Sequence, residues 1–303
     1  MNILIRADSS SIMGMGHVMR DLVLAKLFSG DNVTFASQDL EGNINYKIKE
    51  SGYKLELLKS NEIEELSDLI KKESIELIVI DNYAIDAEYE KELKTKNPTL
   101  KIFSLDDTYE KHHCDILLNH NIYANEKKYK NLVPKSCELR CGEKFTLIRD
   151  EFIREKEKKP YKAKEKKIRV SIAMGGADTQ NLNPKILKIL KKFNHIAVHV
   201  VTTTANKNLK ELKKYVKNKK WITLHINTNK MAKLLRKSDF AIITPSVTAN
   251  EVCFMRKPFM AIKTADNQRY MYKFLKKNGY GVMNKFSAKK LSHYLLNLKS
   301  YND

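Results

Sequence analysis

The sequence has no long apolar segment, and we expect no leader. None of its apolar runs approaches the roughly 18 residues that a helix needs to cross a bilayer. The first residues pass directly into a strand-like segment, "NILIRAD", without the pattern of a secretory signal. We therefore expect a cytoplasmic protein that has no membrane partner.

Cysteine is also scarce, with four residues in a chain of 303. A disulfide framework needs more cysteines at closer spacing, so we expect reduced thiols. The sequence contains enough His and Cys residues for a zinc site, but C-x3-C with an isolated "HHC" is a poor match to the spacing of zinc ligands. We therefore expect no metal. The residues considered for zinc are His112, His113, Cys114, Cys137 and Cys141, and the fourth cysteine is Cys253.

Acidic residues are outnumbered, with 36 Asp and Glu against 56 Lys and Arg and a formal net charge of +20. Such an excess suits a nucleic-acid-binding protein. However, the lysines are spread over nearly every expected helix, and no nucleic-acid-binding motif accompanies them. We expect no nucleic-acid partner and favour an anionic small molecule, with an RNA-binding module as the alternative from another class.

The first half of the chain alternates short apolar runs with helical patterns. Residues 15–29, 62–73 and 86–96 carry apolar side chains at the three- and four-residue spacing of a helix. This alternation predicts a parallel sheet with helices on both faces. The runs expected as strands are "NILI", "NVTFAS", "KLELL", "ELIVID", "LKIFSLD" and "CDILLN".

A charged, almost apolar-free segment, "REKEKKPYKAKEKKIR", interrupts this alternation at residues 154–169. Its composition predicts an exposed linker. The alternation then resumes through "IRVSIAMGG", "HIAVHVVTTT", "WITLHI", "DFAIITP" and "PFMAIK". We therefore predict an α/β protein with two doubly wound, Rossmann-like domains, at residues 1–153 and 170–303, and an interdomain cleft at the carboxyl ends of the strands.

The stretch "SSSIMGMGHVMRD" follows the first expected strand. A dinucleotide-binding fingerprint requires a third glycine where this sequence has Met19, so we do not expect a dehydrogenase. His17 is expected in the first turn of a helix that begins near Met15. The helix dipole there lowers the pKa of an imidazole and keeps it neutral, as a general base requires. The alternative is that His17 only caps or packs.

Two motifs in the second half are candidate phosphate sites. Gly175 and Gly176 in "AMGGADTQN" follow an expected strand and precede a helix, so backbone N–H groups can face an anion. The alternative is a structural turn. In "TPSVTANEV", Ser246 and Thr248 lie at a helix start and Glu251 can accept the hydroxyls of a ribose. Helix capping explains the same pattern.

The blocks together resemble a known family. They are "RADSSSIMGMGHVMRDLVLAK", "LIVIDNYAID", "FSLDD", "HHCDILLN", "VPKSCELRCG", "TLIRDEF", "MGGAD", "NEV" and "DNQ", and they extend over nearly the whole chain. The chain is similar to the UDP-sugar hydrolases of the pseudaminic acid pathway. These have the architecture of GT-B glycosyltransferases and are related to the N-acetylglucosaminyltransferase of peptidoglycan synthesis.

The resemblance implies roles for particular residues. His17 is the expected base that activates water against the anomeric carbon of the sugar. Asp106 and Asp107 follow a strand end, and from this position we interpret them as groups that orient substrate or polar groups near the cleft, or else as a structural cap. The substrate contacts implied are Asp8, Gly16, Arg20, Tyr83 and Asn267, together with Asp107. The UDP contacts implied are Gly175, Gly176, Ser246, Val247 and Glu251.

The resemblance also implies a reaction. It is the inverting hydrolysis of UDP-2,4-diacetamido-2,4,6-trideoxy-β-L-altropyranose to UDP and the free sugar, without metal or cofactor. The partner expected is therefore a nucleotide-sugar substrate, bound by a monomer. The main alternative is a glycosyltransferase that uses a UDP-sugar donor and an acceptor other than water. A second alternative is hydrolysis of a different nucleotide sugar, such as one on the route to legionaminic acid.

Overall fold

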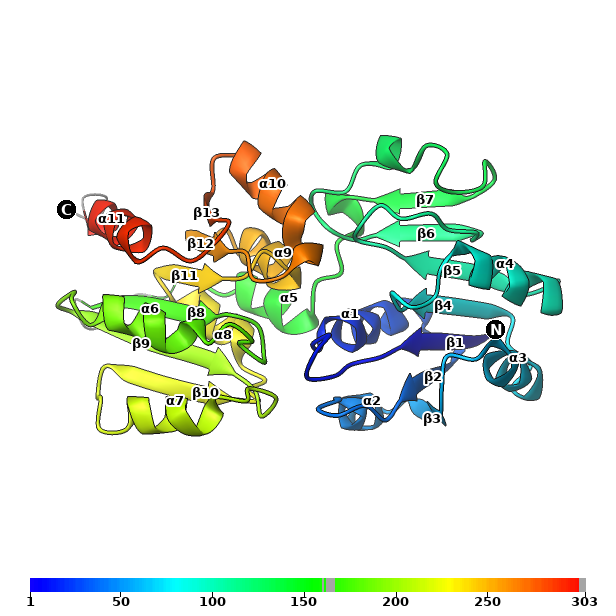
Figure 1. Cartoon of the computed structure of the whole chain (residues 1–303), viewed down its shortest axis with the longest axis horizontal. Helices are drawn as coiled ribbons and strands as arrows, with labels where there is room; N and C mark the ends of the chain where they lie inside the picture. The colour runs from blue at the N-terminus through cyan, green and yellow to red at the C-terminus, as the bar shows by residue number, and fades with distance from the viewer. Residues whose placement is uncertain (160, 162–166, 300–303) are drawn as a thin grey trace. The chain divides into compact units, whose positions relative to one another are not determined.

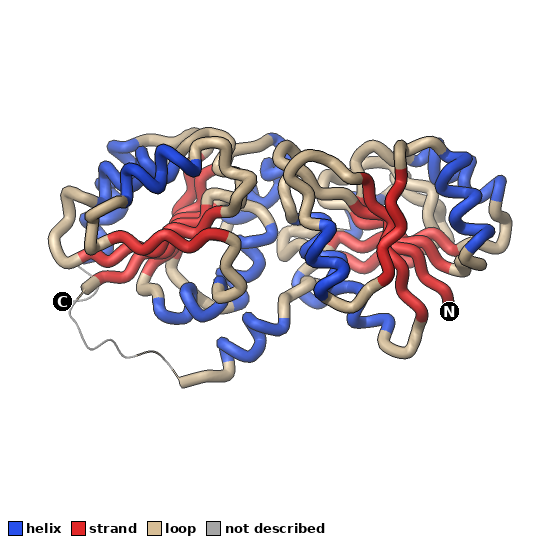
Figure 2. The backbone as a smooth tube through the Cα atoms, turned by 90° about the horizontal axis from the view of Figure 1, so that it is seen from below, coloured by secondary structure: helices blue, strands red, loops and turns tan. Residues whose placement is uncertain are grey.

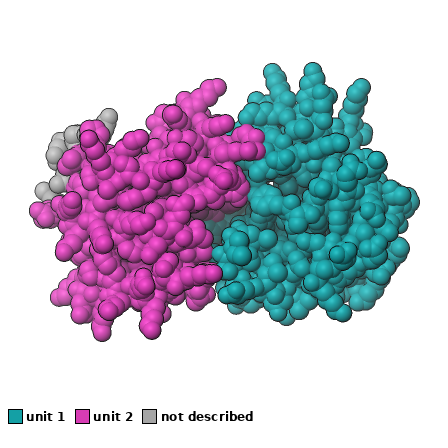
Figure 3. Space-filling model, in the orientation of Figure 1, with its two compact units in different colours: residues 1–149 teal, residues 150–303 magenta. Residues whose placement is uncertain are grey.

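The computed structural model describes residues 1–159, 161 and 167–299. The chain divides into two compact units, Met1–Arg149 and Asp150–Asp303, coloured separately in Figure 3. Each unit is an α/β domain built on one sheet (Figure 1). The predicted fold class, with two doubly wound parallel-sheet domains, is confirmed.

Unit 1 contains a seven-stranded sheet in the order β3-β2-β1-β4-β5-β6-β7, and every neighbouring pair is parallel. Its strands are β1 (Asn2–Ala7), β2 (Asn32–Gln38), β3 (Lys54–Leu58), β4 (Leu77–Asp81), β5 (Lys101–Leu105), β6 (Ile116–Asn119) and β7 (Glu138–Cys141). Its helices are α1 (Gly16–Ala25), α2 (Asn45–Glu50), α3 (Ile63–Lys72) and α4 (Ala87–Lys96).

The central strands of this sheet are largely apolar because helices cover both faces (Figure 2), and buried polar residues such as Arg6 and Asp81 lie near their carboxyl ends. On one face, Leu4 and Ile78 pack with residues of α3 and α4. On the other face, Ile3 and Val79 pack with residues of α1 and α2. Alternate residues of one strand therefore enter two different cores, as the two-residue period of a strand requires.

Unit 2 contains a six-stranded parallel sheet in the order β10-β9-β8-β11-β12-β13. Its strands are β8 (Ile168–Ala173), β9 (Ile196–Thr202), β10 (Ile222–Ile226), β11 (Phe240–Ile243), β12 (Phe259–Ile262) and β13 (Gly281–Met283). Its helices are α5 (Asp150–Lys156), α6 (Leu182–Leu190), α7 (Leu209–Val216), α8 (Met231–Lys237), α9 (Val247–Phe254), α10 (Arg269–Lys277) and α11 (Ala288–Lys299).

The sequence pattern locates most of these elements. The helix predicted at 15–29 is α1 followed by a short 3₁₀ segment, Lys26–Phe28, and the helices predicted at 62–73 and 86–96 are α3 and α4. The pattern misses β7, which contains Glu138 and Arg140 and is only partly buried, and β13, which has three residues. Both are edge strands, where burial imposes little apolar pattern.

The predicted linker overlaps defined structure at both ends. α5 ends at Lys156 and β8 begins at Ile168, while residues 160 and 162–166 of the linker lie outside the described residues. Within the described part of the chain, no helix has both the length and the apolar character needed to cross a membrane.

Candidate active site

The candidate site of unit 1 lies where the strand order reverses. β1 and β4 are hydrogen-bonded neighbours, with Ala7 opposite Asp81, and the chain continues from β1 toward β2 on one side and from β4 toward β5 on the other. Crevices at such a switch point bind the ligands of doubly wound domains. The polar residues that follow these two strands are therefore the candidates for function.

His17 lies in the first turn of α1 beside the end of β4. Its Nδ1 is 2.7 Å from Oδ1 of Asp81, and its side chain is buried. Burial would raise the pKa of Asp81, but the charge of Arg20, followed by His17, outweighs it and holds the pKa well below its usual range. An ionised carboxylate can only accept, so Nδ1 donates its hydrogen to Asp81, and in the tautomer that carries this single ring hydrogen Nε2 is an acceptor.

Arg20 joins this pair to two further predicted residues. It donates from Nε to Oδ2 of Asp81 at 2.6 Å and from Nη2 to Oδ1 of the same carboxylate. Its Nη1 donates to Asp107 at 2.9 Å, and the Tyr83 hydroxyl donates to the other Asp107 oxygen at 2.7 Å. We call His17, Arg20, Asp81, Tyr83 and Asp107 the His17 network.

The aromatic ring of Tyr83 forms the exposed side of this network. It contacts the ring of His17 edge-on, with the centroids 4.8 Å apart and an angle of 86° between the planes. Tyr83 is 49% exposed, whereas Arg20 and Asp81 are buried. Gly16 begins α1, and no atom lies within 4 Å of where its Cβ would stand. The structure thus brings His17, Arg20, Tyr83 and Asp107 together and leaves space beside them.

Asp106 and Asp107 have different environments. Asp106 accepts from the backbone N–H groups of Thr108 and Tyr109 and from the hydroxyl of Tyr129. It therefore stabilises the turn after β5, which is the structural alternative for this residue. Asp107 instead accepts hydrogen bonds from Arg20 and Tyr83. This arrangement corresponds to the other interpretation, in which the residue orients polar groups.

Asp8 is placed differently from the expectation of a substrate contact. Its carboxylate accepts two hydrogen bonds from Arg6, at 2.7 and 2.6 Å, one from the N–H of Gln38 and one from Asn82. These four bonds use the acceptor sites of a carboxylate. Asp8 is 2% exposed, so the geometry favours a role in joining β1, β2 and the β4 loop over direct contact with a ligand.

Sequence reasoning missed three buried polar residues near His17, namely Asp21, Asp81 and His120. Burial, followed by the positive charge of Arg20, lowers the pKa of His120 to about 3, so its ring is neutral. Neither ring nitrogen of His120 has a hydrogen-bond partner among the described residues. Asp81 and His120 lie at the carboxyl ends of β4 and β6, and a search for polar residues at the ends of apolar runs would have found both.

Unit 2 has a corresponding switch point between β8 and β11, which pair with Ile243 opposite Ala173. Gly175 and Gly176 follow β8, and Gly175 has a φ of +78°, a conformation that favours glycine. The carbonyl of Gly176 accepts from the N–H of Thr203 at 3.0 Å, which fixes the turn against the end of β9. The predicted glycine turn and the predicted helix-start motif therefore follow neighbouring strands.

The helix-start motif leads into α9, whose first residue is Val247. The Ser246 side chain does not cap this helix, and its hydroxyl is 3.0 Å from that of Thr244. The capping alternative for Ser246 is therefore wrong. Glu251 is buried on α9, at 3% exposure. Asn267 is exposed in the short 3₁₀ segment Asp266–Gln268, so the predicted residues are divided between the two units.

The zinc grouping considered for the cysteines is not formed. Cys114 Sγ and Cys137 Sγ are 3.7 Å apart, and His112 Nδ1 contacts Glu90 at 2.8 Å. Throughout residues 1–159, 161 and 167–299, no three His, Cys, Asp or Glu side chains are grouped to hold a metal ion.

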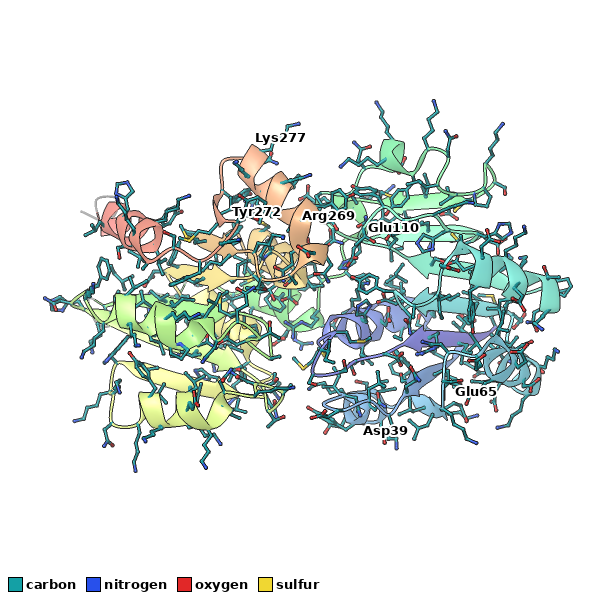
Figure 4. The ribbon with its side chains drawn as sticks, in the orientation of Figure 1. Asp39, Glu65, Glu110, Arg269, Tyr272 and Lys277 are labelled. Atoms are coloured by element: carbon teal, nitrogen blue, oxygen red, sulfur yellow. The ribbon has the colours of Figure 1, made fainter. Side chains whose placement is uncertain are left out.

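Basic side chains project from both units, including Arg269 and Lys277 of α10 (Figure 4).

The buried Arg6–Asp8 pair provides a test of the role assigned to Asp8. Asp8→Ala leaves the guanidinium of Arg6, which is fully buried, without its carboxylate. Breaking a buried pair in this way costs about 3–5 kcal/mol, so the free energy of unfolding of unit 1 should fall by this amount in urea titrations.

The matched control is Glu138→Ala, which removes an exposed ion pair with Arg140 and should cost at most about 1 kcal/mol. An Asp8→Ala protein that unfolds at the same urea concentration as the Glu138→Ala protein would contradict a structural role for Asp8.

Comparisons with known proteins find curated relatives of the chain and solved structures that share its fold. No family model matches the chain. It is 42% identical over 286 residues to the UDP-2,4-diacetamido-2,4,6-trideoxy-beta-L-altropyranose hydrolase of Campylobacter jejuni, a match that covers 94% of this chain and 100% of that protein. It is 23% identical over 274 residues to the spore coat polysaccharide biosynthesis protein SpsG of Bacillus subtilis, covering 88% of this chain and 79% of that protein.

Solved structures show the same fold at low identity. The MurG structure of Acinetobacter baumannii aligns with a TM-score of 0.64 and 13% identity, covering 98% of this chain and 90% of that one. The spinosyn rhamnosyltransferase SpnG aligns with a TM-score of 0.63 and 10% identity, covering 99% and 92%. By its full-length identity to the Campylobacter protein, the chain belongs to the family of UDP-2,4-diacetamido-2,4,6-trideoxy-beta-L-altropyranose hydrolases.

Proposed function

We propose that this protein hydrolyses UDP-2,4-diacetamido-2,4,6-trideoxy-β-L-altropyranose to UDP and the free sugar, as a step of pseudaminic acid biosynthesis. The observation that carries the proposal is the His17–Asp81 pair at the switch point of unit 1, in a chain 42% identical to a hydrolase of that name. The reaction breaks the bond between the anomeric carbon and the leaving phosphate oxygen, and water supplies the new oxygen.

His17 is the general base of this reaction. Nδ1 donates to Asp81, so the lone pair of Nε2 accepts the proton of the attacking water. The carboxylate of Asp81 keeps the ring in this tautomer and stabilises the imidazolium that forms. Attack by water on the face opposite UDP inverts the anomeric carbon, as in other single-displacement cleavages of glycosidic bonds.

The residues of unit 2 bind and stabilise the leaving group. As the bond to the sugar breaks, negative charge grows on the diphosphate of UDP. The N–H groups of the Gly175–Gly176 turn and of the start of α9 donate to this charge, and the positive end of the α9 dipole adds to the effect. Ser246 and Val247 lie at this helix start, and Glu251 accepts hydrogen bonds from the ribose hydroxyls.

The remaining predicted residues bind the sugar or hold the groups that do, except Asp8, which joins strands of unit 1. Tyr83 and Asn267 are both exposed and contact it, while Gly16 provides room at the start of α1. Arg20 and Asp107 act through their bonds to Asp81 and Tyr83, which hold the base and the tyrosine in place. The mechanism uses no metal, because backbone amides supply the stabilisation of the diphosphate.

Isotopic labelling tests the activity directly. The purified protein is incubated with the UDP-linked diacetamido altrose in ¹⁸O-labelled water, with chelator present to remove metal. We expect release of UDP, label in the free sugar and an inverted anomer, measured by mass spectrometry and NMR. Label in UDP would mean attack at phosphorus, and UDP release only on addition of a sugar acceptor would establish a glycosyltransferase.

Replacement of His17 tests the base. His17→Asn removes the Nε2 lone pair, so kcat should fall by about 10²–10⁴-fold, the usual contribution of one positioned base. The dissociation constant of UDP, measured by calorimetry, should stay within about threefold of the wild type, because UDP binds to residues of unit 2. His195→Asn, at an exposed position of unit 2, is the control and should retain full turnover. Equal loss of binding and turnover in His17→Asn would show that His17 is structural.

Replacement of Asp81 tests whether its carboxylate fixes the tautomer of His17 and stabilises the imidazolium. Asp81→Asn keeps the size of the side chain but removes the charge that stabilises the imidazolium, so kcat should fall by about 10²–10⁴-fold while KM changes little. Asp68→Asn, which changes an exposed aspartate of α3, is the matched control. Steady-state rates of UDP release measure both. A kcat near that of the control would remove Asp81 from the mechanism.

A further inference from the structure

Asp21 is a buried acidic residue for which the mechanism above has no use. It lies on α1 four positions after His17, so the two side chains share one face of the helix. Its exposed fraction is 0%, and neither carboxyl oxygen has a hydrogen-bond donor among the described residues. A buried polar group with no partner is rare and calls for a specific explanation.

The charged groups that act on Asp21 are Asp81 on β4 and Arg20 on its own helix. Burial, followed by the negative charge of Asp81, raises the pKa of Asp21 well above its usual value, and Arg20 only partly opposes this rise. Arg20 is also already engaged, since its Nε and Nη2 donate to Asp81 and its Nη1 to Asp107. An ionised Asp21 would therefore lie in the interior without a donor and beside another carboxylate.

A protonated Asp21 resolves this problem. The acid has an O–H to donate, and Asp81 is the neighbouring acceptor. Asp81 accepts at Oδ1 from His17 and Arg20 and at Oδ2 from Arg20 Nε, so Oδ2 has capacity for a further bond. With that bond, each acceptor position of Asp81 is used. Three residues, His17, Arg20 and Asp21, then hold its carboxylate.

We propose that Asp21 is a positioning residue that enters the site as a neutral carboxylic acid and donates to Asp81, fixing the carboxylate that orients His17. The effect on turnover rests on the function proposed above. The protonation of Asp21 does not, because it follows from burial and from the contacts within unit 1. A neutral Asp21 leaves Arg20 to balance Asp81 and Asp107, so the buried cluster carries one excess negative charge, which the proton taken up by His17 offsets.

The protonated state has a signature in stability that needs no substrate. The native state keeps the Asp21 proton as pH rises above about 4, whereas the unfolded state releases it, so stability falls with rising pH until the native pKa is reached. Asp21→Asn is neutral in both states and lacks this loss. From about pH 5 up to the native pKa of Asp21, the ratio of the wild-type unfolding constant to that of Asp21→Asn should rise about tenfold per pH unit.

Hydrogen exchange of peptides from β1 and β4 measures this ratio for unit 1. Asp68→Asn, at an exposed position of α3, is the matched control and supplies the baseline ratio at each pH. A ratio for Asp21→Asn that stays constant against this baseline would show that Asp21 is ionised in the native state, and this result would overturn the proposal.

Kinetics test the positioning role. Asp21→Asn retains a donor and should keep kcat, KM and the pH profile of kcat/KM within about threefold. Asp21→Ala has no donor and should lower kcat about tenfold at unchanged KM. Wild-type kcat in Asp21→Ala, or equal losses in both variants, would overturn the role. If the wild type releases no UDP, the proposed function fails, and the exchange experiment still decides the protonation of Asp21.

Discussion

The candidate site depends on one buried anion, the carboxylate of Asp81. Removing a charge from water costs several kcal/mol, and this cost is recovered only where the charge is well paired. Arg20 provides that pairing with two hydrogen bonds to Asp81, and a third bond to Asp107 fixes the guanidinium itself. Because α1 carries Arg20 and His17 together, the pairing that keeps Asp81 ionised also places the imidazole against it.

A second arginine–aspartate pair, Arg6 and Asp8, lies at the end of the neighbouring strand β1. Comparing it with the Arg20–Asp81 pair shows how a structural carboxylate differs from one that can take part in chemistry. The bonds from Arg6, Gln38 and Asn82 use the acceptor sites of Asp8, so this carboxylate has no capacity for a ligand. Asp81 instead directs one oxygen at an imidazole, a group whose proton can move. The two pairs have similar burial and charge, and their chemistry differs through the neighbouring donors.

The sequence predicts the strands and His17 because these are local properties. Apolar runs mark β1, β4 and β8, and the glycine-rich loop marks the start of α1. Asp81 could not be given its role from the sequence, since that role requires β4 to pair with β1 rather than with β3, which precedes it in the chain. Asp21 looks like an ordinary surface residue of a helix until the packing of α1 on the sheet buries it.

The two switch points differ in a way that suits the two halves of the proposed reaction. A general base needs a tautomer fixed by a neighbouring charge, and unit 1 supplies buried ionised groups around His17. A diphosphate that gains charge needs donors already in position, and unit 2 supplies a glycine turn and a helix start, neither of which contains a side-chain charge that must be desolvated. Amide donors do not titrate, so the stabilisation of the diphosphate by the glycine turn and the helix start should not change with pH.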